Sequence, residues 1–174
     1  MFDWLNDILQ RFLDLIPQPV LILPNEGGVR CNCFPWMSWH RRLDPGWYIE
    51  WPLFQKIIRV EITPQVIDLR PQSVLTKDGH SMVVSGAVRY RVVNAEKAIL
   101  AVQDFDDALI AVACGSIAQE IRSKVRAELM DFSGLKAGVR SDLAKESSGW
   151  GLKIESCYIT DLDKSRSIRL LQNN

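Results

Sequence analysis

Cysteine and histidine side chains within residues 31–40 are the first groups in this chain that suggest chemistry. Cys31 and Cys33 form a C-x-C pair, and His40 follows close behind. A structural zinc site generally takes four protein ligands, whereas only three candidates lie here. We therefore interpret the cysteines as buried or spectator thiols and predict no metal ion at this position.

Two further clusters of polar residues contain side chains that occur in catalytic or metal sites, but their spacing does not suit such a site. Residues 78–81 include an aspartate, a histidine and a serine, but they fall on a predicted hairpin turn, where adjacent side chains point apart. The aspartates within residues 104–107 suit the amino terminus of a helix better than a cation site, since no further acidic ligands follow at loop spacing. We predict no catalytic residues, no cofactor and no enzymatic activity.

The composition is that of an ordinary globular protein. Of the 174 residues 47% are hydrophobic, and 21 basic side chains balance 21 acidic ones, for a formal net charge of +0. This length suits one domain or two small ones that share a core. The neutral charge argues against a nucleic-acid partner, because such binding relies on an excess of basic side chains. Four cysteines without a secretory signal pattern favour free thiols in a reducing compartment.

The first sixteen residues predict an amphipathic helix that ends at Pro17. Its apolar side chains fall within about half of the helix circumference, and its polar side is mainly acidic. Either this helix packs on the rest of the chain or it lies in a membrane interface, where aromatic side chains are favoured. No stretch of the sequence is long enough for a conventional transmembrane helix. The predicted membrane-contact residues here are Phe2, Trp4, Leu5, Ile8, Leu9, Phe12, Leu13 and Ile16.

Short strands and turns follow Pro17. Alternation and turn residues predict strands over residues 20–23, 29–34, 47–50, 58–63, 66–70, 73–76 and 82–92. The first two strands are expected to pair as a hairpin across the turn cluster at residues 24–28. Asp78 and Gly79 predict a type I′ hairpin turn, because both central positions of that turn require positive φ.

The apolar period changes from 2 to 3.6 at Asn94, which is placed to cap a helix. The pattern predicts helices over residues 95–102, from about 104 to 129, and 133–147, then a strand over 152–161 and a last helix over 165–171. The predicted fold class is α+β, with small antiparallel sheets, helices packed on one side, and the amphipathic helix in front.

Four short motifs, in a fixed order, carry a family resemblance. They are Pro45-Gly46-Trp47 with Trp51-Pro52, Leu75-Thr76-Lys77-Asp78-Gly79, Val88-Arg89-Tyr90-Arg91-Val92 with Asn94-Ala95-Glu96-Lys97-Ala98, and Trp150-Gly151-Leu152-Lys153-Ile154-Glu155 through Ile159-Thr160-Asp161-Leu162. Together they resemble the stomatin/prohibitin/flotillin superfamily, also called the SPFH or band 7 domain, and stomatin-type members in particular. The resemblance covers residues from about 20 to 162.

The resemblance implies a non-enzymatic domain that sits on a membrane face, here as a peripheral protein on the cytoplasmic side. Residues 17–72 would form a membrane-proximal first subdomain, and residues 73–162 a second one that stacks against neighbouring copies. Residues 1–16 occupy the place of the family's membrane anchor. Residues 163–174 offer a short helix or tail, which is too short for the long coiled coil that usually helps to close the family's assemblies.

The predicted function is therefore that of a scaffold. We expect the chain to homo-oligomerise through its SPFH domain into a ring or cage that organises a patch of membrane, with membrane lipid and further copies of itself as partners. The alternative implied by the resemblance is a regulatory binding module that docks on a membrane protease or channel and controls access to it.

Residues 31–42 are a second candidate for membrane contact. Trp36 and Trp39 would lie at headgroup depth, with Arg41 and Arg42 near lipid phosphates. An equally good interpretation is that these tryptophans cover the edge of a small β-sheet.

Two other pairs of residues have predicted roles. Trp47 and Trp51 fall within the family-like segment, so we predict that they are structural. Arg89 and Arg91 share one strand face and either contact acidic groups of a neighbouring copy or lie on a solvated face.

Overall fold

The computed structural model describes residues 16–32, 39–130 and 132–164. The predicted helices over 1–16 and 165–171 lie outside these ranges, except for Ile16, and so does Trp36. Within the described part, the chain is α+β, with antiparallel sheets and three α-helices, as predicted. Its packing divides it into two compact units. Unit 1 consists of three segments, residues up to 63, 92–103 and 149–152. Unit 2 consists of residues 64–91, 104–148 and those from 153 onward.

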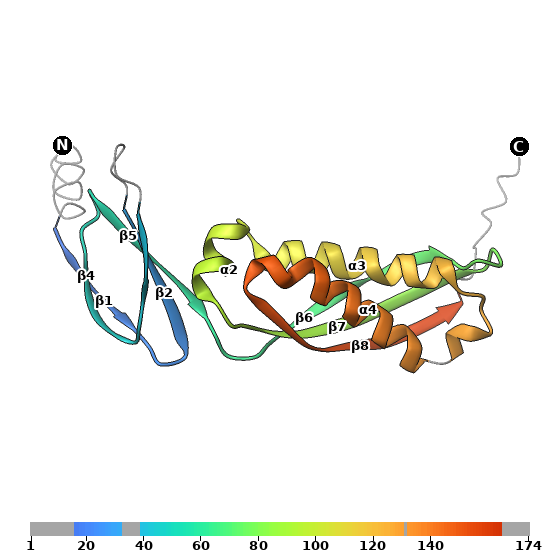
Figure 1. Cartoon of the computed structure of the whole chain (residues 1–174). Coiled ribbons are helices and arrows are strands. Elements are labelled where there is room, and N and C mark those ends of the chain that lie inside the picture. The colour runs from blue at the N-terminus through green and yellow to red at the C-terminus, as the bar shows by residue number, and fades with distance from the viewer. Residues whose placement is uncertain (1–15, 33–38, 131, 165–174) are drawn as a thin grey trace, which may run out of the picture. The chain divides into compact units, whose positions relative to one another are not determined.

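Unit 1 holds a two-stranded ribbon, a three-stranded sheet and one short helix (Figure 1). The ribbon pairs β1 (Gln18–Ile22) with β4 (Gly46–Glu50). The sheet has the order β3 (His40–Leu43), β2 (Glu26–Asn32), β5 (Gln55–Glu61), and β2 is antiparallel to both neighbours. The helix is α2 (Ala95–Ala101), and Asn94 caps it as predicted, because its side chain accepts a hydrogen bond from the Lys97 N–H.

Two glycines of β2 allow close packing on both faces of the sheet. A Cβ atom on Gly28 would lie 2.3 Å from Cδ1 of Ile22, which is only 1% exposed, so the ribbon packs directly on this face. On the other face, a Cβ atom on Gly27 would lie 2.5 Å from Cβ of Ala95 in α2. The core between ribbon and sheet contains Ile22, Leu43 and Ile57, bordered by Val20 and Tyr48.

The predicted hairpin between residues 20–23 and 29–34 is wrong. β1 pairs with β4, with Leu21 opposite Trp47, while β2 lies between β3 and β5. Because Gly28 carries no side chain, Ile22 lies on the face of β2 rather than beside that strand. The turn cluster therefore carries the chain from one layer to the next instead of closing a hairpin.

Unit 2 holds a second three-stranded sheet and the longer helices. Its strand order is β6 (Gln65–Leu75), β7 (Ser81–Val92), β8 (Leu152–Lys164). The helices α3 (Phe105–Ser123) and α4 (Phe132–Glu146) lie on one side of this sheet (Figure 1), with short 3₁₀ turns η1 (Glu128–Met130) and η2 (Ser147–Trp150). β6 continues through residues 72 and 73, where the family resemblance placed a subdomain boundary, so the predicted division of the chain stays a prediction.

The central strand β7 confirms the predicted alternation. Even-numbered residues from Met82 to Val92 are buried, and Tyr90 is fully buried against α3, where its hydroxyl donates to the Asp106 carboxylate. The residues predicted as two strands, 66–70 and 73–76, form the single strand β6. Its pairing with β7 shifts register between Leu69 and Gln72, a bulge that accommodates Pro71.

The turn between β6 and β7 lies where the sequence predicted it, but it is not of type I′. Gly79 has φ +77°, and among the described residues no residue other than glycine has positive φ. The Gly79 N–H donates to the Thr76 carbonyl, and the Thr76 N–H donates to the His80 carbonyl, at 3.0 and 2.9 Å. A three-residue loop closed by a glycine with positive φ replaces the two-residue turn.

Helix α3 is shorter than its apolar period predicts. It ends at Ser123 rather than near residue 129, because the Lys124 N–H donates to the Ile121 carbonyl and the chain then leaves the helix. The Lys124 carbonyl accepts the N–H of Lys77 from the β6–β7 turn. Leu129 is still buried, but as part of η1.

Candidate interaction surface

The ribbon of unit 1 is apolar on both faces. Because side chains alternate across a strand, Val20 and Ile22 of β1 and Tyr48 of β4 point toward the sheet, and their neighbours point away from it. We call the opposite side the outer ribbon face. By register and alternation it comprises Pro19, Leu21 and Leu23 with Trp47, Ile49 and Trp51.

The outer ribbon face has no cover among the described residues of unit 1. Trp47 is 72% exposed, Ile49 57%, and Leu21, which pairs directly with Trp47, 37%. None of its six members is polar or charged. Contiguous exposed apolar side chains with two tryptophans mark a surface that binds another protein or a membrane.

More exposed apolar side chains flank the two strands. Ile16 precedes β1 and is 53% exposed, while Leu53 and Phe54 follow β4 and are 54% and 38% exposed. The N–H groups of Phe54 and Gln55 both donate to the Trp51 carbonyl, so a tight turn holds this segment next to the end of β4. The apolar surface therefore extends along the chain beyond both strands of the ribbon.

The prediction that Trp47 and Trp51 are structural is wrong, since both are exposed. The sequence does contain a usable signal. Apolar residues occupy successive positions in 20–23, and 47–49 are Trp, Tyr and Ile, so each strand is apolar on two sides. Only one face of a two-stranded ribbon can pack against the sheet, so the other apolar face stays exposed.

Trp39, Arg41 and Arg42 lie in or just before β3, and all three are exposed. Trp36 lies outside the described residues, as do the predicted contacts of the first fifteen residues. The structure therefore places Trp39, Arg41 and Arg42 at or next to an edge strand of the sheet of unit 1, with both arginine side chains accessible. Their contact with lipid stays a prediction.

Arg89 and Arg91 have an acidic partner within their own unit. Nε of Arg89 lies 3.0 Å from Oε2 of Glu155 in β8, and Nε of Arg91 lies 3.6 Å from Oε1 of the same carboxylate. Both arginine side chains are nearly half exposed. Their contact with a neighbouring copy stays a prediction.

The polar residues of the β6–β7 turn form a structural network. The Thr76 hydroxyl donates to the Asp78 carboxylate, which also accepts the Arg126 N–H at 3.3 Å and lies 3.6 Å from Nε2 of His80. The hydrogen bond from Thr76 is the main reason why the pKa of Asp78 is lowered below its ordinary value of 3.8. These bonds fasten the turn to the chain after α3.

The thiols have no arrangement for catalysis or metal binding in the described part of the chain. Cys33 lies outside it, Cys31 is half-buried, and Nε2 of His40 lies 2.8 Å from Oε1 of Glu96 in α2. Burial raises the pKa of the Cys114 and Cys157 thiols, which disfavours the reactive thiolate. The described residues contain no cluster of three potential metal ligands.

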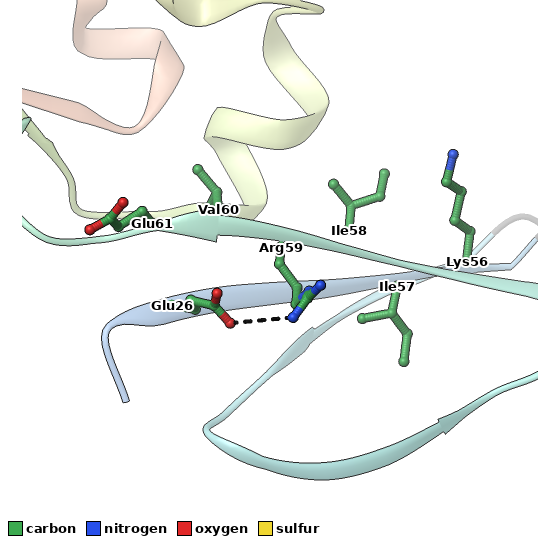
Figure 2. A pocket seen from close by; sticks show the side chains of 7 residues that line it. All are labelled: Glu26, Lys56, Ile57, Ile58, Arg59, Val60 and Glu61. Atoms are coloured by element: carbon green, nitrogen blue, oxygen red, sulfur yellow. Dashed lines mark ion pairs between the residues drawn. The ribbon is translucent and has the colours of Figure 1, made fainter. Parts of the chain in front are cut away.

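A groove of about 500 Å³ follows β5 and is lined by Glu26 and residues 56–61 (Figure 2). Lys56, Ile58 and Val60 point to one side of the strand, and Ile57 and Arg59 to the other. An ion pair in this lining joins Nη1 of Arg59 to Oε2 of Glu26 at 3.8 Å. The residues that line this groove follow the edge of one strand. They do not include a nucleophilic side chain next to a base.

Within residues 16–32, 39–130 and 132–164, no helix is long and apolar enough to cross a membrane.

Comparison with known proteins agrees with the fold. Residues 22–170 match the model of the SPFH domain / Band 7 family. An uncharacterised protein of Methanocaldococcus jannaschii is 30% identical over 129 residues, 74% of this chain and 65% of that protein. Mouse stomatin is 29% identical over 68% of this chain and 42% of its own length, and a stomatin homologue of Pyrococcus horikoshii is 26% identical over 68% and 45%.

These alignments span less than two thirds of each relative's length. They nevertheless include most of this chain, and the family match begins within β1 and runs past β8. The chain belongs to the SPFH domain / Band 7 family and is a stomatin-like member of it.

Proposed function

We propose that this protein is a non-enzymatic, peripheral membrane scaffold that contacts lipid through the outer ribbon face and assembles with further copies of itself. The family is generally membrane-associated, which makes lipid the natural cover for exposed apolar side chains. The single observation that carries the proposal is the exposure of Trp47, Ile49 and Leu21 on one uncharged face.

The chemistry of the face suits the boundary between headgroups and acyl chains. Tryptophan concentrates at that boundary because its ring is apolar while its N–H can still reach water or a headgroup. The formal net charge is +0, so attachment would depend on apolar burial more than on attraction to anionic lipid. The predicted helix over residues 1–16 would add a second apolar contact, and its sequence leads directly into β1.

The cytoplasmic side is the proposed location, because Cys114 and Cys157 are free thiols, as is usual in a reducing compartment. Assembly into a ring or cage is proposed from the family. Mass photometry in lipid tests this directly. Large discrete assemblies support the scaffold, whereas monomers that retain one stoichiometric membrane protein support the regulatory module.

Liposome flotation tests the lipid-contact surface. Trp47→Ser with Ile49→Ser should weaken binding to phosphatidylcholine vesicles by roughly tenfold or more, because each buried apolar side chain contributes about 1.5–3 kcal/mol. Added salt should have little effect on the wild-type protein. A matched control is Val93→Ser with Leu100→Ser, which removes two exposed apolar side chains of unit 1 that lie outside the ribbon.

The control should float like the wild type. Equal flotation of wild type, ribbon variant and control would contradict a role for the outer ribbon face in membrane contact. Deletion of residues 1–16 tests the helix separately, since the ribbon remains intact in that variant.

A further inference from the structure

Two arginines face each other across neighbouring strands of unit 1. Arg30 of β2 is directly opposite Arg41 of β3 in the antiparallel register, so both side chains lie on the same side of the sheet. The next pair along the strands on that side, Gly28 and Leu43, packs against Ile22 of the ribbon. The two arginines thus lie one residue pair beyond the packed core between ribbon and sheet. Like charges placed directly opposite each other destabilise a sheet unless something lies between them.

The guanidinium group of Arg30 is partly withdrawn from water. Its Cζ lies 5.6 Å from the centre of the Tyr48 ring, and Tyr48 borders the core of unit 1. Nε of Arg30 is buried and has no hydrogen-bond partner among the described residues. A buried donor without an acceptor costs free energy, and the two terminal nitrogens of a guanidinium group can donate to oxygens of an anion.

Several other basic side chains of the described chain do have acidic partners. Arg59 pairs with Glu26, Arg89 pairs with Glu155, and His40 pairs with Glu96. No described carboxylate lies within ion-pair distance of Arg30 or Arg41.

Glu50 is the acidic residue of β4, the strand that carries Tyr48. It lies on the same inward side of β4 as Tyr48, two residues further along that strand, and forms no ion pair with either arginine. The site therefore combines two guanidinium groups with an aromatic platform, and no carboxylate of the described residues forms an ion pair with either arginine.

We propose that Arg30 and Arg41 bind a phosphate group, with the anion bridging the two guanidinium groups next to the core between ribbon and sheet. Two positive charges favour a phosphomonoester, which carries up to two negative charges, over a phosphodiester with one. The source is either free phosphate or the headgroup of an anionic lipid such as phosphatidic acid. The lipid source rests on the proposed function, because it requires unit 1 to lie at a membrane.

Inorganic phosphate tests the site without a membrane. Phosphate, added against chloride at equal ionic strength, should raise the Tm of the wild-type chain, since a ligand that binds only the folded state stabilises it. Arg41→Gln should abolish the shift. Arg42→Gln is the matched control, because it removes the same charge from the neighbouring position of β3, whose side chain points to the other side of the sheet.

Phosphate binding should be at least tenfold weaker in Arg41→Gln and within twofold of wild type in Arg42→Gln. Equal weakening in both variants would show that general surface charge attracts phosphate and would overturn the site. No phosphate-dependent Tm shift in the wild type would overturn it as well. Arg30→Gln also loses its contact with Tyr48, so Arg41→Gln is the deciding variant.

Vesicles separate the two sources of phosphate. Phosphatidylcholine vesicles with added phosphatidic acid should bind the wild type several-fold more tightly than pure phosphatidylcholine does, and should give Arg41→Gln no such gain. A phosphate-dependent Tm shift without binding to any vesicle would contradict the membrane proposal but support the site for free phosphate. Binding to pure phosphatidylcholine with no effect of phosphate or phosphatidic acid would support the membrane proposal and overturn the phosphate site.

Discussion

Gly86 shows how closely β7 and β8 approach each other in unit 2. A Cβ atom at this position would lie 2.6 Å from the backbone oxygen of Tyr158, and a backbone oxygen cannot swing aside as a side chain does. Gly86→Ala should therefore lower the free energy of unfolding by about 1–3 kcal/mol, as overpacking in a core does. Urea unfolding followed by circular dichroism measures this change.

Gly115 provides the comparison for that measurement. It is an exposed residue in the interior of α3, and a Cβ atom there would have no neighbour within 4 Å. Gly115→Ala should raise the free energy of unfolding by about 0.5–1 kcal/mol, because alanine favours the helix. A loss of stability in both variants would contradict the close approach at Gly86 as the cause.

Asp78 gives the β6–β7 turn a pH dependence with a definite sign. The hydrogen bond from Thr76 holds the pKa of Asp78 below 3.8 in the folded state, so the folded chain favours the carboxylate. This contribution to stability is present above the ordinary pKa and is lost as the pH falls through the folded value. Asp78→Asn should be less stable than the wild type at pH 7, and the difference should shrink toward pH 3. Urea midpoints across this range test the prediction, and a constant difference would refute it.

The start of α3 depends on one side chain. Oδ1 of Asp104 accepts hydrogen bonds from the N–H groups of Asp106 and Asp107, both at 3.1 Å, which satisfies two donors that the first helical turn leaves open. Asp104→Ala should lower the free energy of unfolding by about 1 kcal/mol. Asp104→Asn retains the acceptor oxygen and should restore most of this loss. If asparagine is no better than alanine, charge at the helix terminus rather than capping carries the effect.

Elements whose residues repeat with a clear period were predictable from the sequence. The alternation of β7 from Met82 to Val92 and the cap of α2 at Asn94 depend on neighbouring residues only, and both predictions are confirmed. The end of α3 depends on a distant contact, the bond between the Lys124 carbonyl and the Lys77 N–H, which no local pattern reveals.

The strand pairing and the exposure of side chains in unit 1 were also less predictable, because they depend on contacts between residues far apart in the sequence. The local turn signal between β1 and β2 favoured a hairpin, but the missing side chain at Gly28 lets β1 pack on the face of β2 and pair with β4. That arrangement alone decides that Trp47 faces outward. The sequence supplied the apolar residues of the candidate surface, and the tertiary packing selected which of them stay uncovered.

Self-assembly can be tested on the face of the unit 2 sheet that carries Arg89 and Arg91. Alternation places these side chains on the side opposite Tyr90, and Val66, which is 59% exposed, lies directly across from Arg89. If this face contacts another copy, Arg89→Glu with Arg91→Glu should shift the mass distribution from assemblies toward monomers in mass photometry. The folded chain should lose little stability, because exposed ion pairs contribute about 0–1 kcal/mol.

Glu155→Gln is the control that distinguishes the intrachain ion pairs of these arginines from their proposed contact with a neighbouring copy. It removes their intrachain carboxylate but leaves both guanidinium groups free to reach a neighbouring copy. Assembly should therefore survive in Glu155→Gln and fail in the double arginine variant. If both variants assemble like the wild type, the ion pairs with Glu155 serve the fold alone, and the contact between copies has to lie on another surface.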